Sequence, residues 1–168
     1  MTMLQWRQST LEKEEIMGYH TVNELEHFNF SGAEILEIRE YRDQLIFDLG
    51  FVTILPENSC NRDVREMGTN QLTLKLSHVK DIKIVLEGYK VYDADGNPKE
   101  QYEDEVIEKK DFPATYQTLQ GSGVYSLNRQ GEDYIFYLDT EERTYLLAVT
   151  AEGNSQEWER FMNKTPAY

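Results

Sequence analysis

The chain has 168 residues, with 31 Asp and Glu against 17 Lys and Arg, which gives a formal net charge of −14. Strong negative charge repels nucleic acid and anionic membranes, so we expect neither as a partner. A single cysteine, Cys60, excludes an internal disulfide and a thiolate zinc cluster. The sequence has neither an apolar leader nor an apolar run of membrane length, which predicts a cytoplasmic protein.

The length fits one domain with its own core, for which eleven Tyr, seven Phe and two Trp supply large side chains. Its predicted parts are a helical N-terminal segment at 1–30, an antiparallel β region at 31–152, and a C-terminal helix with a tail at 153–168. The predicted fold is mainly β, an antiparallel sandwich or incomplete barrel with short helices near both termini. An α+β two-layer arrangement is the alternative.

Two helices are predicted near the N-terminus. Ser9 with Glu12, and Thr21 with Glu24, have the spacing of a capping box. Gly18 would end the first helix. The second helix would place three apolar residues on one face: Val22, Leu25 and Phe28.

From Ala33 onward apolar residues alternate with polar ones, which is typical of half-buried strands. The predicted strands lie at 45–49, 51–55, 72–76, 82–86, 124–127, 134–138 and 145–149. Two irregular stretches interrupt them, a long loop at 56–69 and an acidic segment at 93–113. After the last strand, Asn154 and Glu157 have the spacing of a helix cap, which predicts the C-terminal helix.

One segment has the oxygen ligands of a calcium loop in the right order. Asp93, Asp95, Asn97 and Asp104 match four of the ligand positions, but Pro98 stands where such a loop needs glycine. We therefore interpret the segment as a turn.

Motifs for catalysis are missing from the sequence. His20, His27 and His78 lack the spacing of a metal site, and Ser122 lies in Gly-Ser-Gly rather than in a nucleophile elbow. Arg62, two positions on, is the only cationic residue beside Cys60 in the sequence, so little is present to lower the pKa of the thiol and activate it. We predict a protein that is not an enzyme, with no catalytic, cofactor-binding or metal-binding residues.

Acidic residues and tyrosines occur together in the segment 92–105. We predict that six of them contact a partner: Glu100, Glu103, Asp104, Glu105, Tyr92 and Tyr102. An acidic rim around aromatic contacts would select a basic protein. Packing between neighbouring strands is the alternative explanation for the tyrosines.

Three segments carry a resemblance to a known type of protein. They are Phe30-Ser31-Gly32-Ala33-Glu34-Ile35, Leu45-Ile46-Phe47-Asp48-Leu49, and Leu72-Thr73-Leu74-Lys75-Leu76 followed by Val79-Lys80-Asp81-Ile82. Their hydrophobic spacing, over about a third of the chain, resembles small bacterial domains that include immunity proteins encoded beside polymorphic toxins. Such families usually show His-Asp where this chain has Ser31-Gly32. The resemblance implies inhibitory binding and assigns no site residue.

We therefore expect a non-enzymatic cytoplasmic binding protein, an acidic inhibitor of the immunity type for a basic protein partner. One alternative is a β-barrel that holds a small ligand between Phe47, Phe51, Tyr134 and Phe136. A more remote alternative is a hydrolase with two facing carboxylates in an open cleft. Exposed strand edges leave the oligomeric state open.

Overall fold

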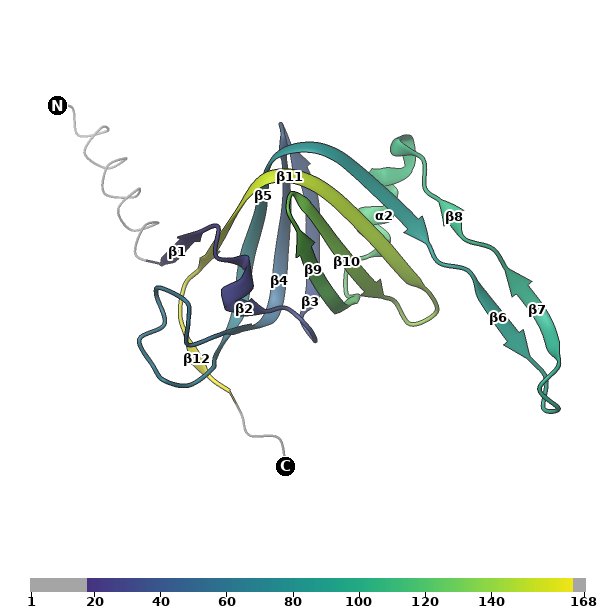
Figure 1. Cartoon of the computed structure of the whole chain (residues 1–168), viewed down its shortest axis with the longest axis horizontal. Coiled ribbons are helices and arrows are strands. Elements are labelled where there is room, and N and C mark those ends of the chain that lie inside the picture. The colour runs from purple at the N-terminus through teal and green to yellow at the C-terminus, as the bar shows by residue number, and fades with distance from the viewer. Residues whose placement is uncertain (1–17, 165–168) are drawn as a thin grey trace.

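The computed structural model describes residues 18–164, and strands dominate them (Figure 1). The strands are β1 (Tyr19–Val22), β2 (Phe28–Asn29), β3 (Glu34–Tyr41), β4 (Gln44–Ile54), β5 (Met67–Leu86), β6 (Tyr89–Tyr92), β7 (Pro98–Tyr102), β8 (Glu105–Val106), β9 (Gly123–Gln130), β10 (Asp133–Asp139), β11 (Thr144–Trp158) and β12 (Met162–Asn163). The helical segments are η1 (Leu25–His27), η2 (Lys109–Asp111) and α2 (Phe112–Thr118). Within residues 18–164, none of these helices is long and apolar enough to cross a membrane. The helix predicted to begin at Ser9 lies outside the described residues.

Ten strands form one antiparallel sheet that curls on itself, and β6 and β7 form a separate two-stranded sheet. The longest strand, β5, pairs with β4 and with β11. From β11 the sheet continues through β10, β9, β3 and β4 back to β5, but β9 and β3 pair only at Gly123 and Glu34. The sheet is therefore an incomplete barrel, which confirms the predicted mainly β fold class.

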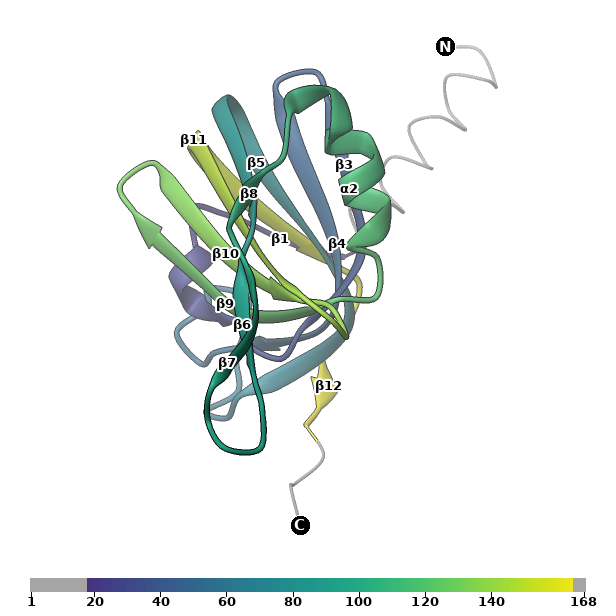
Figure 2. The ribbon, with the colours of Figure 1, turned by 90° about the vertical axis from the view of Figure 1, so that its right-hand side faces the viewer.

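The short helix α2 lies against β3 (Figure 2). Pro113 stands in its first turn, where a missing N–H removes no hydrogen bond. The helix buries Phe112 and Tyr116, and burial, together with the nearby Glu40 of β3, raises the pKa of Tyr116. The helix therefore adds apolar side chains to the core beside β3.

Alternating apolar residues of β4 and β5 form the centre of the core, as the sequence pattern predicts. Leu45 pairs with Leu76 and Phe47 with Leu74, and all four are fully buried. The ring of Phe47 stacks on that of Phe136 from β10, with the centroids 4.6 Å apart. This contact joins opposite sides of the curled sheet, so the two sides share one core.

The helix predicted to begin at Thr21 is wrong. Residues 19–22 form β1, which pairs with the last part of β11, and only Leu25–His27 make a short helical turn. Thr21 is buried, and its hydroxyl donates a hydrogen bond to Gln156 Oε1 at 2.7 Å instead of capping a helix. Pairing with β11 outweighs the local capping signal, because burial and sheet hydrogen bonds exceed the small differences in helix propensity.

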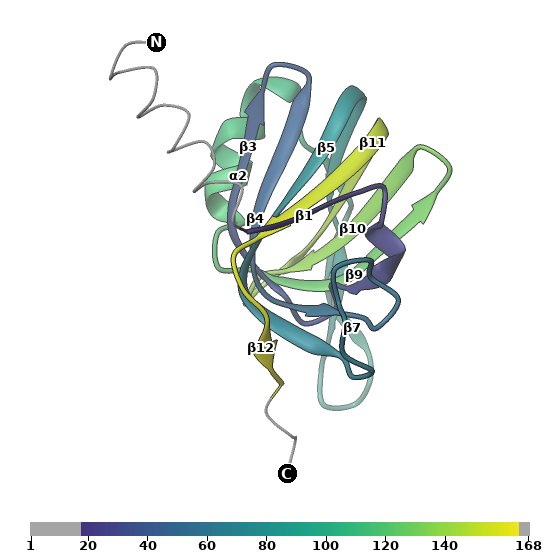
Figure 3. The same ribbon diagram turned by 90° about the vertical axis from the view of Figure 1, so that its left-hand side faces the viewer.

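The predicted C-terminal helix is also wrong, because β11 continues without a break to Trp158. Asn154, Gln156 and Trp158 alternate along the strand and are all buried. Gln156 Nε2 donates to Asn154 Oδ1 at 2.6 Å, and Asn154 Nδ2 donates to the hydroxyl of Tyr134 at 2.9 Å. Figure 3 shows β1 beside this end of β11, with β12 below them. Buried polar residues in a strand resemble a cap and a helix face in sequence, which explains the error.

The ligand-binding wall expected from Phe47, Phe51, Tyr134 and Phe136 does not form. Phe47, Tyr134 and Phe136 have no exposed surface, whereas Phe51 is 68% exposed on the outside of the barrel. Phe51 also has a left-handed φ of 60°, so its side chain departs from the alternation of β4. These four side chains therefore do not line a common cavity.

The buried hydrogen bonds of Gln156 give a test of the strand assignment. Replacing Gln156 with Ala leaves the buried polar groups of Thr21 and Asn154 without this partner, so we expect a loss of about 2–3 kcal/mol in the free energy of unfolding. Ser155→Ala, at the half-buried neighbouring position, is the control and should change the free energy of unfolding by less than about 0.5 kcal/mol. Urea denaturation measures both variants. Equal stabilities would contradict the buried position of Gln156.

Candidate functional site

A hairpin formed by β6 and β7 projects from the barrel (Figures 1 and 2). We call residues 87–108 the acidic arm. The arm begins directly after β5 and returns through β8, which pairs with the end of β5 at Val85 and Leu86. Every residue of β7 and three of the four residues of β6 are exposed. The hairpin therefore contributes little to the core and presents most of its surface to solvent.

The acidic arm carries much of the negative charge of the protein. It has two lysines, Lys90 and Lys99, and eight acidic residues, so its formal charge is −6 of the total of −14. The acidic residues are Glu87, Asp93, Asp95, Glu100, Glu103, Asp104, Glu105 and Glu108. A projecting element with this charge creates a negative field that extends away from the barrel.

Two tyrosines stack on one another across the hairpin. Tyr89 pairs with Tyr102, and their ring centroids are 4.5 Å apart at an interplanar angle of 21°. The hydroxyl of Tyr102 donates to Glu100 Oε2 at 3.2 Å, and this hydrogen bond and the charge of Glu100 raise the pKa of Tyr102. Tyr92 lies nearer the tip and is 55% exposed. The arm therefore offers ordered aromatic surface beside carboxylates.

Arg143 fixes the base of the acidic arm to the barrel, and a hydrogen bond at Gly88 joins the two chain segments of the arm to each other. Arg143 places its guanidinium 4.9 Å from the ring centroid of Tyr89 and donates from Nη2 to the carbonyl of Glu87 at 2.8 Å. The N–H of Gly88 donates to Asp104 Oδ1 at 2.6 Å. A Cβ atom at Gly88 would overlap the carbonyl oxygen of Tyr102, so only glycine fits where the two chain segments cross.

All six residues predicted to contact a partner lie on the acidic arm, in two groups. Tyr92, Glu100 and Tyr102 belong to the hairpin, and Glu103, Asp104 and Glu105 lie where the chain returns to the barrel. Within the second group, Asp104 has a structural role because it binds the backbone of Gly88. Glu103 accepts a hydrogen bond from Gln101, and Glu105 is exposed within β8.

Sequence reasoning missed two residues of this surface, Tyr89 and Arg143. The sequence around Tyr89 does not reveal the ring that meets it from the opposite strand. Arg143 comes from the turn between β10 and β11, far from the arm in sequence. No local pattern could link it to Tyr89, because only the pairing of β5 with β11 brings the two together.

The predicted turn at the tip of the hairpin is confirmed. Asp93 Oδ1 accepts hydrogen bonds from the N–H groups of Asp95 and Asn97, both at 2.9 Å. Gly96 follows with a φ of 81°, which glycine adopts without strain. Asp93 therefore holds the backbone of the turn, which explains the acidic spacing without a metal ion.

The three histidines lie beside different carboxylates. Their contacts are His20 with Glu157 at 3.9 Å, His27 with Glu24 at 2.9 Å and His78 with Asp43 at 2.9 Å. Within residues 18–164, no three His, Cys, Asp or Glu side chains come together as a group that could hold a metal ion.

A second ordered surface is the loop 55–66 between β4 and β5, near the end of the barrel opposite the acidic arm. Glu24 holds it through two hydrogen bonds from Ser59, from the backbone N–H at 2.9 Å and from the hydroxyl at 2.5 Å. Burial alone would raise the pKa of Glu24, but the hydrogen bonds from Ser59 and His27 outweigh burial and lower it. The amide of buried Asn61 donates to backbone carbonyls within the loop. Polar contacts rather than apolar packing thus fix the loop.

The lowered pKa of Glu24 predicts that acid destabilises this loop. A carboxyl whose pKa is lower in the folded state stabilises that state above its unfolded pKa, and the stabilisation is lost as the pH falls through the folded value. As the pH falls through the folded pKa of Glu24, we expect a lower protection factor at the Ser59 amide, taken against the intrinsic exchange rate at each pH, and a loss of about 1 kcal/mol in the free energy of unfolding. Glu24→Gln should remove that pH dependence, whereas Glu57→Gln, at an exposed loop position, should retain it. The same pH dependence in both variants would contradict the role of Glu24.

The close crossing at Gly88 predicts that Gly88→Ala disrupts the base of the acidic arm. The added methyl group must displace the backbone of residues 102–104, so the arm amides should exchange with solvent at least about ten times faster. Gly123→Ala is the matched control, because its Cβ would meet no atom within 4 Å. Hydrogen exchange followed by NMR measures both variants. Unchanged protection of the Gly88 amide would show that the arm does not depend on this crossing.

The chain was also compared with known proteins. No protein-family model, curated protein or solved structure matches it. Its function is therefore inferred from the surfaces described above.

Proposed function

We propose that this protein is a non-enzymatic binding protein and that its acidic arm contacts a basic protein partner. The observation that carries the proposal is the projecting hairpin, which combines a formal charge of −6 with stacked, partly exposed tyrosines. Neither property alone would suffice, since acidic segments also serve solubility and tyrosines also pack sheets. Their combination on an element outside the core favours binding over stability.

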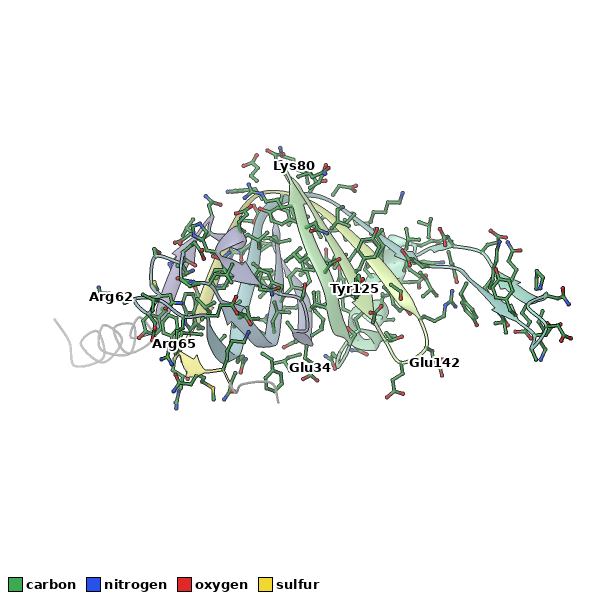
Figure 4. The ribbon with its side chains drawn as sticks, turned by 60° about the horizontal axis from the view of Figure 1, so that its bottom comes forward. Glu34, Arg62, Arg65, Lys80, Tyr125 and Glu142 are labelled. Atoms are coloured by element: carbon green, nitrogen blue, oxygen red, sulfur yellow. The ribbon has the colours of Figure 1, made fainter. Side chains whose placement is uncertain are left out.

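Charge would act first, by bringing a basic partner to the arm. The Debye length at physiological ionic strength is about 8 Å, so carboxylates on a projecting element attract cations more effectively than carboxylates screened behind the barrel. The other end of the molecule is less acidic. The loop 55–66 has a formal charge of −1, because Arg62 and Arg65, which Figure 4 labels at the end opposite the arm, offset two of its three acidic residues. This difference would orient the protein so that the arm meets the partner first.

Docking would then use the tyrosine rings. Tyrosine provides a large contact area with few rotatable bonds, so ordering it on binding costs little entropy. In the arm this ordering already exists, because Tyr89 and Tyr102 stack on one another and Arg143 covers Tyr89. The close crossing of the two chain segments at Gly88 fixes the direction of the arm. A partner therefore binds a preformed surface, which reduces the free-energy cost of association.

The shape of the arm supports an inhibitor of the immunity type. Neighbouring strands are about 5 Å apart, so a two-stranded hairpin is narrow enough to enter a cleft in another protein. Carboxylates along the hairpin would pair with lysines and arginines in such a cleft. This agrees with the inhibitory binding that the resemblance of residues 30–82 implies. We place the protein and its partner in the cytoplasm.

Charge variants of the arm test this proposal. Glu100→Gln, Glu103→Gln and Glu105→Gln together remove three charges and leave Asp104 to hold Gly88. The full chain is immobilised and presented with a cell extract at about 0.05 M and about 0.5 M salt, which changes the Debye length several-fold. We expect a partner with an excess of Lys and Arg, retained at low salt and released at high salt. The arm variant should bind this partner at least about ten-fold more weakly, because each close charge pair contributes about 1 kcal/mol or more to the free energy of binding.

The matched control removes three charges elsewhere, through Glu57→Gln, Asp81→Asn and Glu159→Gln. All three positions are exposed and lie outside the arm. The control should retain nearly the full affinity of the parent chain. Equal weakening in both triple variants would show that net charge alone drives binding. Recovery of only acidic or neutral partners, bound equally at both salt concentrations, would refute the proposal.

A further inference from the structure

An open cavity of about 490 Å³ lies at the end of the molecule opposite the acidic arm. One wall is apolar and consists of Tyr19 from β1, Met67 from β5 and Phe161, which precedes β12. The other wall is residues 59–63 of the loop described above. This cavity is not the barrel interior in which the sequence placed a ligand. Its lining comes from the loop 55–66, β1, the start of β5 and the segment before β12.

The apolar wall is firmly supported. The rings of Tyr19 and Phe161 meet edge to face, with centroids 4.6 Å apart. Both rings also pack on Trp158, each at 5.6 Å, and Trp158 is only 4% exposed. An aromatic wall anchored to the core keeps its shape when a ligand approaches, which lowers the cost of binding.

The polar wall contains one cation that is free to bind a ligand. Asp63 is engaged by Arg65, with Oδ2 and Nη2 3.0 Å apart. Arg62 makes no ion pair with any residue in the described range 18–164, and its side chain is exposed at the cavity. Within the lining the formal charges of Arg62 and Asp63 balance, and Arg65, which lies outside the lining, pairs with Asp63. Arg62 is therefore the charged group of this wall that can attract an anionic group.

We infer that this cavity binds a small carboxylate with an aromatic body. The guanidinium of Arg62 matches the planar carboxylate and can donate two parallel hydrogen bonds to it. The aromatic body packs on Tyr19 and Phe161. The volume of the cavity lies within the range of about 300–1,000 Å³ that is typical of small-molecule sites. This activity is separate from the protein partner proposed above and uses the other end of the molecule.

Cys60 provides a reporter inside the cavity. It lines the loop wall, is half-buried, and is the only cysteine in the chain. A ligand that occupies the cavity covers the thiol and slows its alkylation. When exchange with the ligand is fast, the rate falls by the factor 1 + [L]/Kd, where [L] is the free ligand concentration.

The experiment measures alkylation of Cys60 in the full chain by iodoacetamide, a neutral reagent, using mass spectrometry. The probe is 3-phenylpropionate, and 3-phenylpropionamide is its neutral match. At four times Kd the carboxylate should slow alkylation about five-fold. The amide should bind at least about ten-fold more weakly, because it lacks the charge-assisted hydrogen bonds. Rates in each variant are compared with the ligand-free rate of that same variant.

Arg62→Gln should reduce the affinity for the carboxylate to about that for the amide. Arg160→Gln is the matched control, an exposed arginine outside the cavity lining, and should leave protection unchanged. Absence of protection at concentrations of about 10 mM, which corresponds to a negligible affinity, would overturn the inference. Equal protection by acid and amide, or full protection in Arg62→Gln, would overturn the role of Arg62. None of these results bears on the acidic arm, whose binding is measured separately.

Discussion

The pairing of β5 with two strands at once is the interaction on which the rest of the structure depends. Over its 20 residues, β5 joins β4 through one stretch of its ladder and β11 through a longer one. These two ladders curl the sheet and bring the alternating leucines of β4 and β5 onto one core. The same strand then runs directly into the acidic arm at one end, and its other end lies beside the cavity. Both proposed binding surfaces are therefore attached to one rigid element.

This arrangement separates two kinds of surface on one small domain. The arm is negatively charged, exposed on all sides and shaped like a narrow ribbon. The cavity is concave, contains the guanidinium of Arg62, and has an aromatic wall that packs on Trp158. The proposed protein partner and the proposed small carboxylate differ in size and in charge, so each would use one of the two surfaces. The strong net charge describes the whole chain, but it does not describe its two ends equally.

Strands with one buried face could be predicted well from the sequence. Leu72, Leu74 and Leu76 alternate with polar residues, because this part of β5 has one face in the core. Leu45, Phe47 and Leu49 keep the same spacing in β4, although Ile46 between them is buried as well. The last part of β11, at one end of the barrel, does not follow this alternation of buried apolar and exposed polar residues. Asn154 and Gln156 are polar yet buried, since they hydrogen-bond to Tyr134 and Thr21. A polar residue that points inward cannot be distinguished from a helix cap without its distant partner.

The candidate sites were predictable to different degrees. Composition alone located the acidic arm, because negative charge and tyrosine are both dense there. The strand β7 escaped notice since all of its residues are exposed, which leaves no alternation to detect. The cavity could not be found from the sequence at all. Tyr19, Arg62 and Phe161 are far apart along the chain and meet only through the pairing of β1 with β11 and of β12 with β5.

The exposure of the arm has a consequence for how this protein can evolve. No residue of β6 or β7 is buried, so most substitutions there change the free energy of unfolding by less than about 0.5 kcal/mol. Gly88, Asp104 and Arg143 lie outside these two strands and hold the base of the arm, so substitutions there have larger effects. Selection could therefore alter what the hairpin recognises while the barrel stays as it is. Related proteins that bind different partners would then differ in sequence at the tip of the hairpin and keep Gly88, Asp104 and Arg143.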